Sequence, residues 1–174
     1  NEQLHTRYIM KNILMPRRPK DAVALIAFTA TDLYPDEKWN FVFGSASLKQ
    51  RIGVWSIYRN GDPAKSAKDF ILCLKRTIKT AIHETGHILG IKHCIAYECL
   101  MNGSNSRAES DSSQLYYCPS CLYKLTWNTR KSAASRFKRL IELCEKLKLF
   151  EEKRFFEQSL ELLQAIHSNE HNKF

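Results

Sequence analysis

The sequence predicts an α/β fold with a small mixed, mostly parallel sheet, one long helix and helices at the carboxy-terminal end. Three observations predict it: short β-rich runs within residues 21–58, a helical pattern of apolar residues over 70–82, and two more helical patterns between 133 and 166. At 174 residues, with 44% hydrophobic and 26% charged residues, the chain has the size and composition of one globular domain.

The first elements follow from local patterns. Residues 3–14 carry apolar side chains at helical spacing, and they predict a short amphipathic helix that Pro16 ends. Residues 21–29 form a continuous apolar run, which is typical of a central strand buried on both faces. Two further β-rich runs, residues 39–45 and 53–58, complete the predicted sheet.

A long helix should follow the turn at residues 60–63, because Ser66 and Asp69 have the spacing of a helix cap. Apolar residues then recur at helical spacing: Phe70, Ile71, Leu74, Ile78, Ala81 and Ile82. This stripe predicts a helix that packs against the sheet and continues without a break into His83.

Residues 83–94 read HETGHILGIKHC and indicate a metal site. Side chains four residues apart share one face of a helix, so His83 and His87 can contact one ion. Gly90 is placed to end the helix in a left-handed turn, which would bring His93 back as a third ligand. Three protein ligands are typical of a catalytic zinc, which keeps its fourth position for water.

Glu84, beside His83, is the expected general base, because zinc lowers the pKa of a bound water to roughly 7 and a carboxylate can take its proton. The same carboxyl would later protonate the leaving amine. A chance His-Glu-x-x-His would account for three of these residues. It would not account for Gly90 and His93 at their spacing as well.

Four of the six cysteines indicate a second metal site: Cys94, Cys99, Cys118 and Cys121. Their C-x4-C and C-x-x-C spacings suit a closed tetrahedral zinc in an intracellular chain. Paired disulfides and redox cysteines are the alternatives. Cys73 and Cys144 lie in apolar helical patterns and are expected to be buried thiols.

The zinc motif, with a methionine downstream of its third histidine, resembles the metzincin signature. The run Cys94-x4-Cys99-x-Met101, followed by Cys118-x-x-Cys121, is similar to archaemetzincins (archaelysins) in particular. Residues 32–34 (DLY) and 39–44 (WNFVFG) are also similar to the sheet of that family. The resemblance spans roughly residues 21–140 and implies a metzincin-like catalytic domain with two zinc ions, one catalytic and one structural.

The resemblance also implies roles for residues outside the two ligand sets. Met101 would lie beneath the three histidines as an apolar floor, the Met-turn. The last strand before the active-site helix would be an antiparallel edge strand, so that a substrate would lie along Val54, Trp55 and Ser56. An edge covered by the chain itself is the alternative. Because archaemetzincins begin with a strand and residues 3–14 predict a helix, we expect that first strand to be missing.

We expect residues 1–148 to form the catalytic domain with both zinc sites, and residues 149–174 to form a helical extension packed on it. The extension could also serve as a partner-binding helix. Residues 102–113 are rich in Ser and Asn, lack periodicity and are expected to form a mobile loop near the cleft.

The predicted function is hydrolysis of peptide bonds in a peptide or protein substrate, and an aminopeptidase is one form it could take. The alternative is a catalytically idle, zinc-stabilised binding module that uses its basic surface. Glu84 favours the enzyme, because zinc binding alone does not require that carboxylate.

The formal net charge is +9, but the basic residues are scattered, which favours solvated faces over a nucleic-acid surface. Nucleic acid is kept as the minor alternative partner. We expect no membrane partner, since no apolar run is long enough to span a bilayer. We also expect a monomer. The cysteine usage predicts an intracellular location, cytoplasmic or nuclear.

Overall fold

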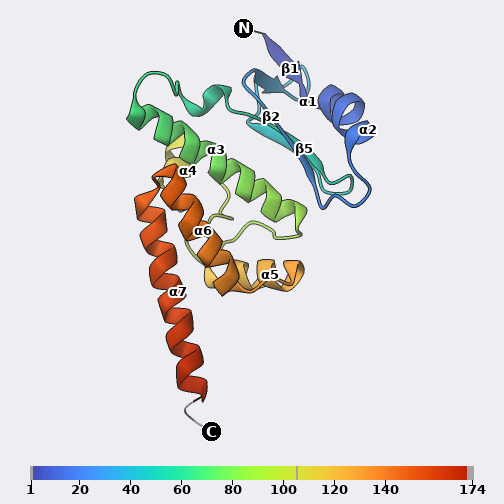
Figure 1. Cartoon of the computed structure of the whole chain (residues 1–174). Coiled ribbons are helices and arrows are strands. Elements are labelled where there is room, and N and C mark those ends of the chain that lie inside the picture. The colour runs from blue at the N-terminus through green and yellow to red at the C-terminus, as the bar shows by residue number, and fades with distance from the viewer. Residues whose placement is uncertain (1, 105, 172–174) are drawn as a thin grey trace.

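The computed structural model describes residues 2–104 and 106–171. Figure 1 shows three layers: small sheets at one end, the long helix α3 across the middle, and the carboxy-terminal helices beyond it. The mixed α/β architecture that the sequence predicts is therefore present, with α3 between the strands and the later helices.

The strands form two small sheets, and two of their three pairings are parallel. In the first sheet, β1 (Gln3–His5) pairs parallel with β3 (Asp32–Tyr34). The second has the order β2 (Leu25–Thr29), β5 (Ile52–Ser56), β4 (Gly44–Ser47). There β5 is parallel to β2 and antiparallel to β4.

The amino-terminal segment differs from its prediction. Its first residues form β1, and the helical turns begin only afterwards with α1 (Thr6–Tyr8), the π-helical η1 (Ile9–Leu14) and α2 (Met15–Arg17). Pro16 lies in the first turn of α2 and does not end the helix, because the missing N–H of proline is tolerated there.

A strand therefore precedes the first helical turn, contrary to the expectation that this segment starts in a helix. Long-range contacts hold it: the Gln3 amide donates to Asp32 Oδ2 at 3.0 Å and to the Asn40 carbonyl at 2.8 Å. His5 Nε2 lies 2.9 Å from the Pro35 carbonyl oxygen. Since these partners are 29 to 37 residues away in the sequence, no local pattern could reveal the strand.

The order of strands in the second sheet is the reverse of the prediction. β2, predicted as the central strand, is an outer strand whose Phe28 side chain is 45% exposed. β5, predicted as the edge, is central and buried along its whole length. Its backbone already pairs with a strand on each side, so the expectation of an edge strand is wrong, and Val54, Trp55 and Ser56 offer no free edge to a peptide.

Helix α3 (Ala67–Ile88) begins where the sequence predicts. The Ser66 hydroxyl accepts the Asp69 backbone N–H at 3.1 Å, which is the predicted cap. A short 3-10 turn, η2 (Tyr58–Asn60), connects β5 to it. The predicted packing of its apolar stripe on the sheet is wrong, however, because Ile71 and Ile78 pack in the core of the carboxy-terminal helices.

The remaining helices are α4 (Arg107–Ser112), α5 (Pro119–Thr129), α6 (Ala133–Leu147) and α7 (Phe150–His171). The predicted helical hairpin is formed by α6 and α7, which pack side by side (Figure 1).

The core of this hairpin contains Phe137, Cys144, Leu149 and Phe156, so it extends across residue 148. The division into two domains at that residue stays a prediction. Cys73 and Cys144 are buried free thiols, as expected.

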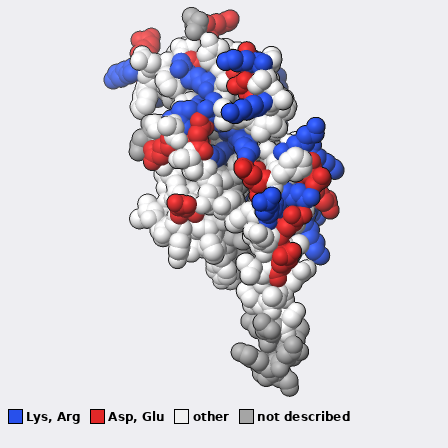
Figure 2. Space-filling model, turned by 90° about the vertical axis from the view of Figure 1, so that its left-hand side faces the viewer, with Lys and Arg blue, Asp and Glu red and all other residues white. Residues whose placement is uncertain are grey.

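The charged side chains on the face shown in Figure 2 alternate in sign. Lysines and arginines lie next to aspartates and glutamates, and they do not form a continuous basic surface. Opposite charges also form ion pairs, as Lys75 does with Glu152 at 2.8 Å. Within residues 2–104 and 106–171, no helix combines the length and apolar character needed to cross a membrane.

Candidate metal centre

Three histidines meet at the end of α3. His83 and His87 are one turn apart on the helix, which ends at Ile88. Gly90, two residues later, has a φ of +83° and forms the predicted left-handed turn. The Ile91 N–H donates to the Gly86 carbonyl at 2.9 Å and secures this reversal. The chain then returns so that His93 lies beside the other two histidines.

The imidazole geometry fits a metal ion. Ring centroids are 4.7 Å apart for His83 and His87, 4.8 Å for His87 and His93, and 5.3 Å for His83 and His93. One ring nitrogen of each lies within 4.8 Å of the others. His83 Nδ1 lies 2.8 Å from the Leu100 carbonyl oxygen, and His87 Nδ1 lies 2.8 Å from that of Ile91. A carbonyl can only accept, so both Nδ1 atoms carry the proton and both Nε2 lone pairs are free for a metal.

The protonation of these histidines also suits metal binding, which needs the neutral imidazole. Burial lowers the pKa of His83 below its ordinary value. The pKa of His93 is lowered by burial and by repulsion from His87 and His83.

Glu84 lies in the same pocket, which has a volume of about 270 Å³ and is also lined by His83, His93 and Phe43. Burial raises the pKa of the Glu84 carboxyl, and attraction to His87 and His93 offsets only part of that rise. A carboxyl group with a raised pKa binds a proton more readily, which suits a general base.

The four cysteines form a second cluster, in which each sulfur lies within 4.8 Å of the others. All four are free thiols, so the structure does not support the disulfide alternative. Cys94 Sγ and Cys118 Sγ are 3.8 Å apart. Two sulfur ligands of a tetrahedral zinc at a Zn–S distance of about 2.3 Å would be separated by about 3.8 Å, so this pair fits such an ion.

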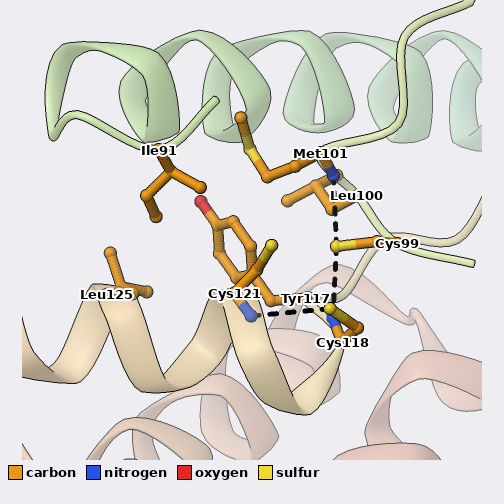
Figure 3. Packing of buried hydrophobic residues seen from close by; sticks show 8 residues of the cluster. All are labelled: Ile91, Cys99, Leu100, Met101, Tyr117, Cys118, Cys121 and Leu125. Atoms are coloured by element: carbon orange, nitrogen blue, oxygen red, sulfur yellow. Dashed lines mark hydrogen bonds between the residues drawn. The ribbon is translucent and has the colours of Figure 1, made fainter. Parts of the chain in front are cut away.

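The surroundings of the sulfurs are those of metal-binding thiolates. Cys99 Sγ accepts backbone N–H groups from Cys118 at 3.2 Å and from Met101 at 3.4 Å (Figure 3). Burial raises the pKa values of Cys99 and Cys121. For Cys94, burial is outweighed by hydrogen bonds from backbone N–H groups, and its pKa is about 7. The buried thiols would therefore lose their protons when a cation binds.

Asn102 joins the two centres, and sequence reasoning missed it. Its Nδ2 donates to the carbonyls of Cys94 at 2.7 Å and Tyr97 at 2.9 Å, while its Oδ1 accepts the Cys99 N–H at 2.7 Å. Because Cys94 follows His93 directly, this side chain also restrains the third histidine. The signal that could have identified it is the tendency of asparagine side chains to form hydrogen bonds with nearby backbone groups in turns.

Met101 is wholly buried and lies against α3 at Gly86, one residue before His87. Figure 3 shows it between this helix and Tyr117. A Cβ atom at Gly86 would lie 2.5 Å from Met101 Sδ, so this close approach requires glycine. Tyr117, also missed, donates its hydroxyl to the Ile82 carbonyl at 3.1 Å, and burial raises its pKa to about 12.

Residues 102–113 are not the simple loop that the sequence predicts, because they contain α4. The Ser106 hydroxyl caps this short helix by accepting the Glu109 N–H at 3.1 Å. Lys79 Nζ, on α3, donates to the carbonyls of Ser110 and Ser113, each at 2.5 Å. Residue 105 lies outside the described residues, and the α4 part of the segment forms a wall of the pocket.

Comparisons with known proteins agree with this geometry. The family model of Peptidase family M54 matches residues 20–127. Archaemetzincin-2 of Rattus norvegicus is 36% identical over 168 residues, which cover 82% of this chain and 46% of that protein. Archaemetzincin-2 of Homo sapiens is 36% identical over 167 residues, with coverages of 81% and 46%. The chain thus spans about half the length of these curated relatives.

Solved structures give the same result. The crystal structure of archaemetzincin from Methanopyrus kandleri superposes with a TM-score of 0.59 at 29% identity, covering 74% of this chain and 67% of that one. Archaemetzincin from Archaeoglobus fulgidus, solved in complex with malonate, gives 0.50 at 35% identity, with coverages of 62% and 64%.

Proposed function

The chain belongs to peptidase family M54, the archaemetzincins, and from this premise we propose that it is a zinc-dependent metallopeptidase. The observation that carries the proposal is the convergence of His83, His87 and His93, two of which have their Nδ1 protons fixed by backbone carbonyls. A bound zinc would supply a Lewis acid that activates water at neutral pH and polarises the scissile carbonyl.

Glu84 would carry the proton. Its carboxylate lies in the same pocket as the histidines, so it can accept a proton from water and pass it to the nitrogen of the leaving amine. The rise in its pKa that burial causes supports this role, since a base that later acts as an acid must hold the proton that it has accepted.

The substrate would lie along β4, because β5 has no free edge. β4 (Gly44–Ser47) is an outer strand that pairs with β5 on one side, and Phe43, just before it, lines the pocket. An extended peptide added at the other side of β4 would be held by main-chain hydrogen bonds. This strand replaces Val54, Trp55 and Ser56 as the proposed substrate-binding element.

We further propose a second zinc, held by Cys94, Cys99, Cys118 and Cys121, as a structural ion. Cys94 is adjacent to His93, and the Cys94 N–H donates to the Met101 carbonyl at 2.8 Å. The second ion would therefore fix the segment that positions the third histidine and Met101, and the chain would bind two zinc ions.

The function is tested by removing and restoring the metal. Chelator-treated protein and the same protein reloaded with zinc are each incubated with a mixed peptide library, and the products are identified by mass spectrometry. Reloaded protein should cut and stripped protein should not, and the positions of the cuts would separate an aminopeptidase from an endopeptidase. A reloaded protein with two zinc ions that cuts nothing would contradict the proposal.

A further inference from the structure

The pocket beside Glu84 contains two cationic side chains that the proposed mechanism does not use, Lys79 and Arg107. Among the described residues that line the pocket, Glu84 is the one carboxylate, and it is assigned to the proton transfer. Apart from His83 and His93, the remaining polar side chains of the lining are hydroxyls and an amide, so the wall offers no second carboxylate to balance these two cations.

Arg107 is held in place but keeps most of its hydrogen-bonding capacity. Its guanidinium carbon lies 4.3 Å from the centroid of the Phe43 ring, and its Nη2 donates to the Arg59 carbonyl at 3.1 Å. A guanidinium has five N–H donors. In the part of the chain that the structure describes, this is the one hydrogen bond that its side chain makes, and no carboxylate lies within ion-pair distance.

Asp111, the acidic side chain whose charge acts on Arg107, is already engaged by another cation. Asp111 accepts two hydrogen bonds from Arg76, at 2.8 Å from Nε and 2.5 Å from Nη2. Burial, together with repulsion from Arg76, lowers the pKa of Arg107, although Asp111 acts in the opposite sense. The charged guanidinium of Arg107 has thus lost part of its hydration, and the neighbouring side chains do not fully replace the lost stabilisation.

Lys79 contributes charge more than contacts. Two of its three N–H donors hold the carbonyls of Ser110 and Ser113. Its position four residues before His83 places it on the same face of α3. It therefore keeps the α4 wall in place and adds a positive field to the pocket.

We propose that Arg107 makes this pocket selective for peptides that carry a carboxylate next to the scissile bond. The carboxylate is either an Asp or Glu side chain or a free carboxy-terminus, since both present two oxygens to the planar fork of a guanidinium. This proposal rests on the proposed peptidase function, because it names the substrate class of the same pocket. The stacking on Phe43, next to β4, sets Arg107 beside the strand where the peptide would lie.

The test measures binding, so that it does not depend on turnover. Zinc-loaded Glu84→Gln protein is titrated calorimetrically with blocked hexapeptides in which a single Glu is moved through every position. Each is paired with the same peptide carrying Gln. A third series carries Gln and a free carboxy-terminus. At one position, or at the free end, the carboxylate peptide should bind about tenfold more tightly than its neutral partner.

The added Arg107→Gln substitution should reduce that ratio to within about twofold, and Arg107→Lys should keep part of it. Arg130→Gln is the matched control, because Arg130 also stacks on an aromatic ring, 5.4 Å from the Trp127 centroid, but does not line the pocket. The control should leave the ratio unchanged. Since each ratio is taken within one protein, a partly inactive preparation does not alter it.

Equal binding of carboxylate and neutral peptides in all three series would overturn the proposal, and so would a preference that survives Arg107→Gln. The series that shows the preference identifies its source, either an acidic side chain or the chain end. If zinc-loaded wild-type protein cuts no peptide, the proposed peptidase function fails. The binding ratios still decide whether Arg107 selects carboxylates.

Discussion

At the scale of single residues, the two candidate metal centres depend on a few side chains that are not ligands. Asn102 makes three hydrogen bonds of 2.7–2.9 Å to backbone groups of the turn that begins at Cys94. No other side chain bridges that turn so completely among the hydrogen bonds of the described residues. Asn102 therefore holds the cysteine turn and, through Cys94, the position of His93.

Asn102→Ala should lower the free energy of unfolding of the zinc-loaded protein by about 2–3 kcal/mol, at roughly 1 kcal/mol for each lost hydrogen bond. It should also speed the loss of zinc to a chelator. Asn128→Ala is the control, because Asn128 makes one such bond, to the Leu89 carbonyl at 2.7 Å. Urea unfolding that shows equal losses for both variants would contradict this role of Asn102.

Asp32 provides a pH-dependent contribution to stability. It is buried and accepts hydrogen bonds from Arg59 at 3.0 and 2.7 Å, which hold the pKa of its carboxyl below the ordinary value of 3.8. A pKa lowered by folding stabilises the protein above the unfolded pKa of about 3.9, and this stability is lost as pH falls through the folded pKa.

Asp32→Asn should therefore cost about 1–3 kcal/mol at pH 7. Its free energy of unfolding should also fall less steeply than that of wild type below pH 4. Urea titrations between pH 7 and pH 3 measure both effects. If the free energy of unfolding fell below pH 4 as steeply in the variant as in the wild type, Asp32 would not be responsible for that loss of stability.

At the scale of elements, the sequence predicts what local patterns determine. The Ser66 cap, the turn at Gly90 and the helices α3, α6 and α7 follow from signals within a few residues. The order of β2 and β5 in the sheet does not follow from such signals, because an apolar run indicates that a strand is buried but not which strands lie beside it. Parallel pairing of Leu25 with Ile52 joins residues far apart in the chain.

The same distinction holds in the site. The clustering of the three histidines, with Glu84 beside them, and of the four cysteines was predictable, because metal chemistry restricts both residue type and spacing. Tyr117 and Arg107 were not, because their partners come from segments far away in the sequence. Asn102 was missed although its partners lie in its own turn, because asparagine is a common residue type in turns of any kind.

The packing of Trp55 against two glycines gives a test of the β4–β5 pairing. A Cβ atom added at Gly44 or at Gly53 would lie 2.1 Å from the indole, and Trp55 is 1% exposed and has no room to move. Gly44→Ala and Gly53→Ala should each cost about 1–3 kcal/mol of unfolding free energy. Gly103→Ala is the control, because its Cβ would meet its nearest neighbour at 3.4 Å. Costs as small as in this control would contradict the packing.

At the scale of the whole molecule, the cysteine cluster connects the layers. Cys94 and Cys99 lie in the segment after α3. Cys118 and Cys121 lie at the start of α5, and Figure 3 shows them facing Cys99. The same core includes Met101, which packs beneath α3. A metal at the cysteines would therefore join the catalytic segment to the carboxy-terminal layer.

Cys118→Ser or Cys121→Ser should lower peptide cleavage and occupancy of the histidine site together, because the segment bearing His93 loses its anchor. Zinc content per chain and cleavage rate are measured on the same samples. Cys144→Ser is the control, since that buried thiol lies in the hairpin core away from both clusters. Full activity in a Cys118→Ser protein that has lost one zinc would show that the histidine site does not depend on the cysteine site.

The most direct measurement compares the cleavage rate of one peptide by zinc-loaded wild-type protein and by zinc-loaded Glu84→Gln. If Glu84 is the general base at a three-histidine zinc, kcat should fall by about 10²–10⁴ while both proteins hold the same zinc. Equal rates at equal zinc content would mean that Glu84 does not carry the proton, and the proposed mechanism would be wrong.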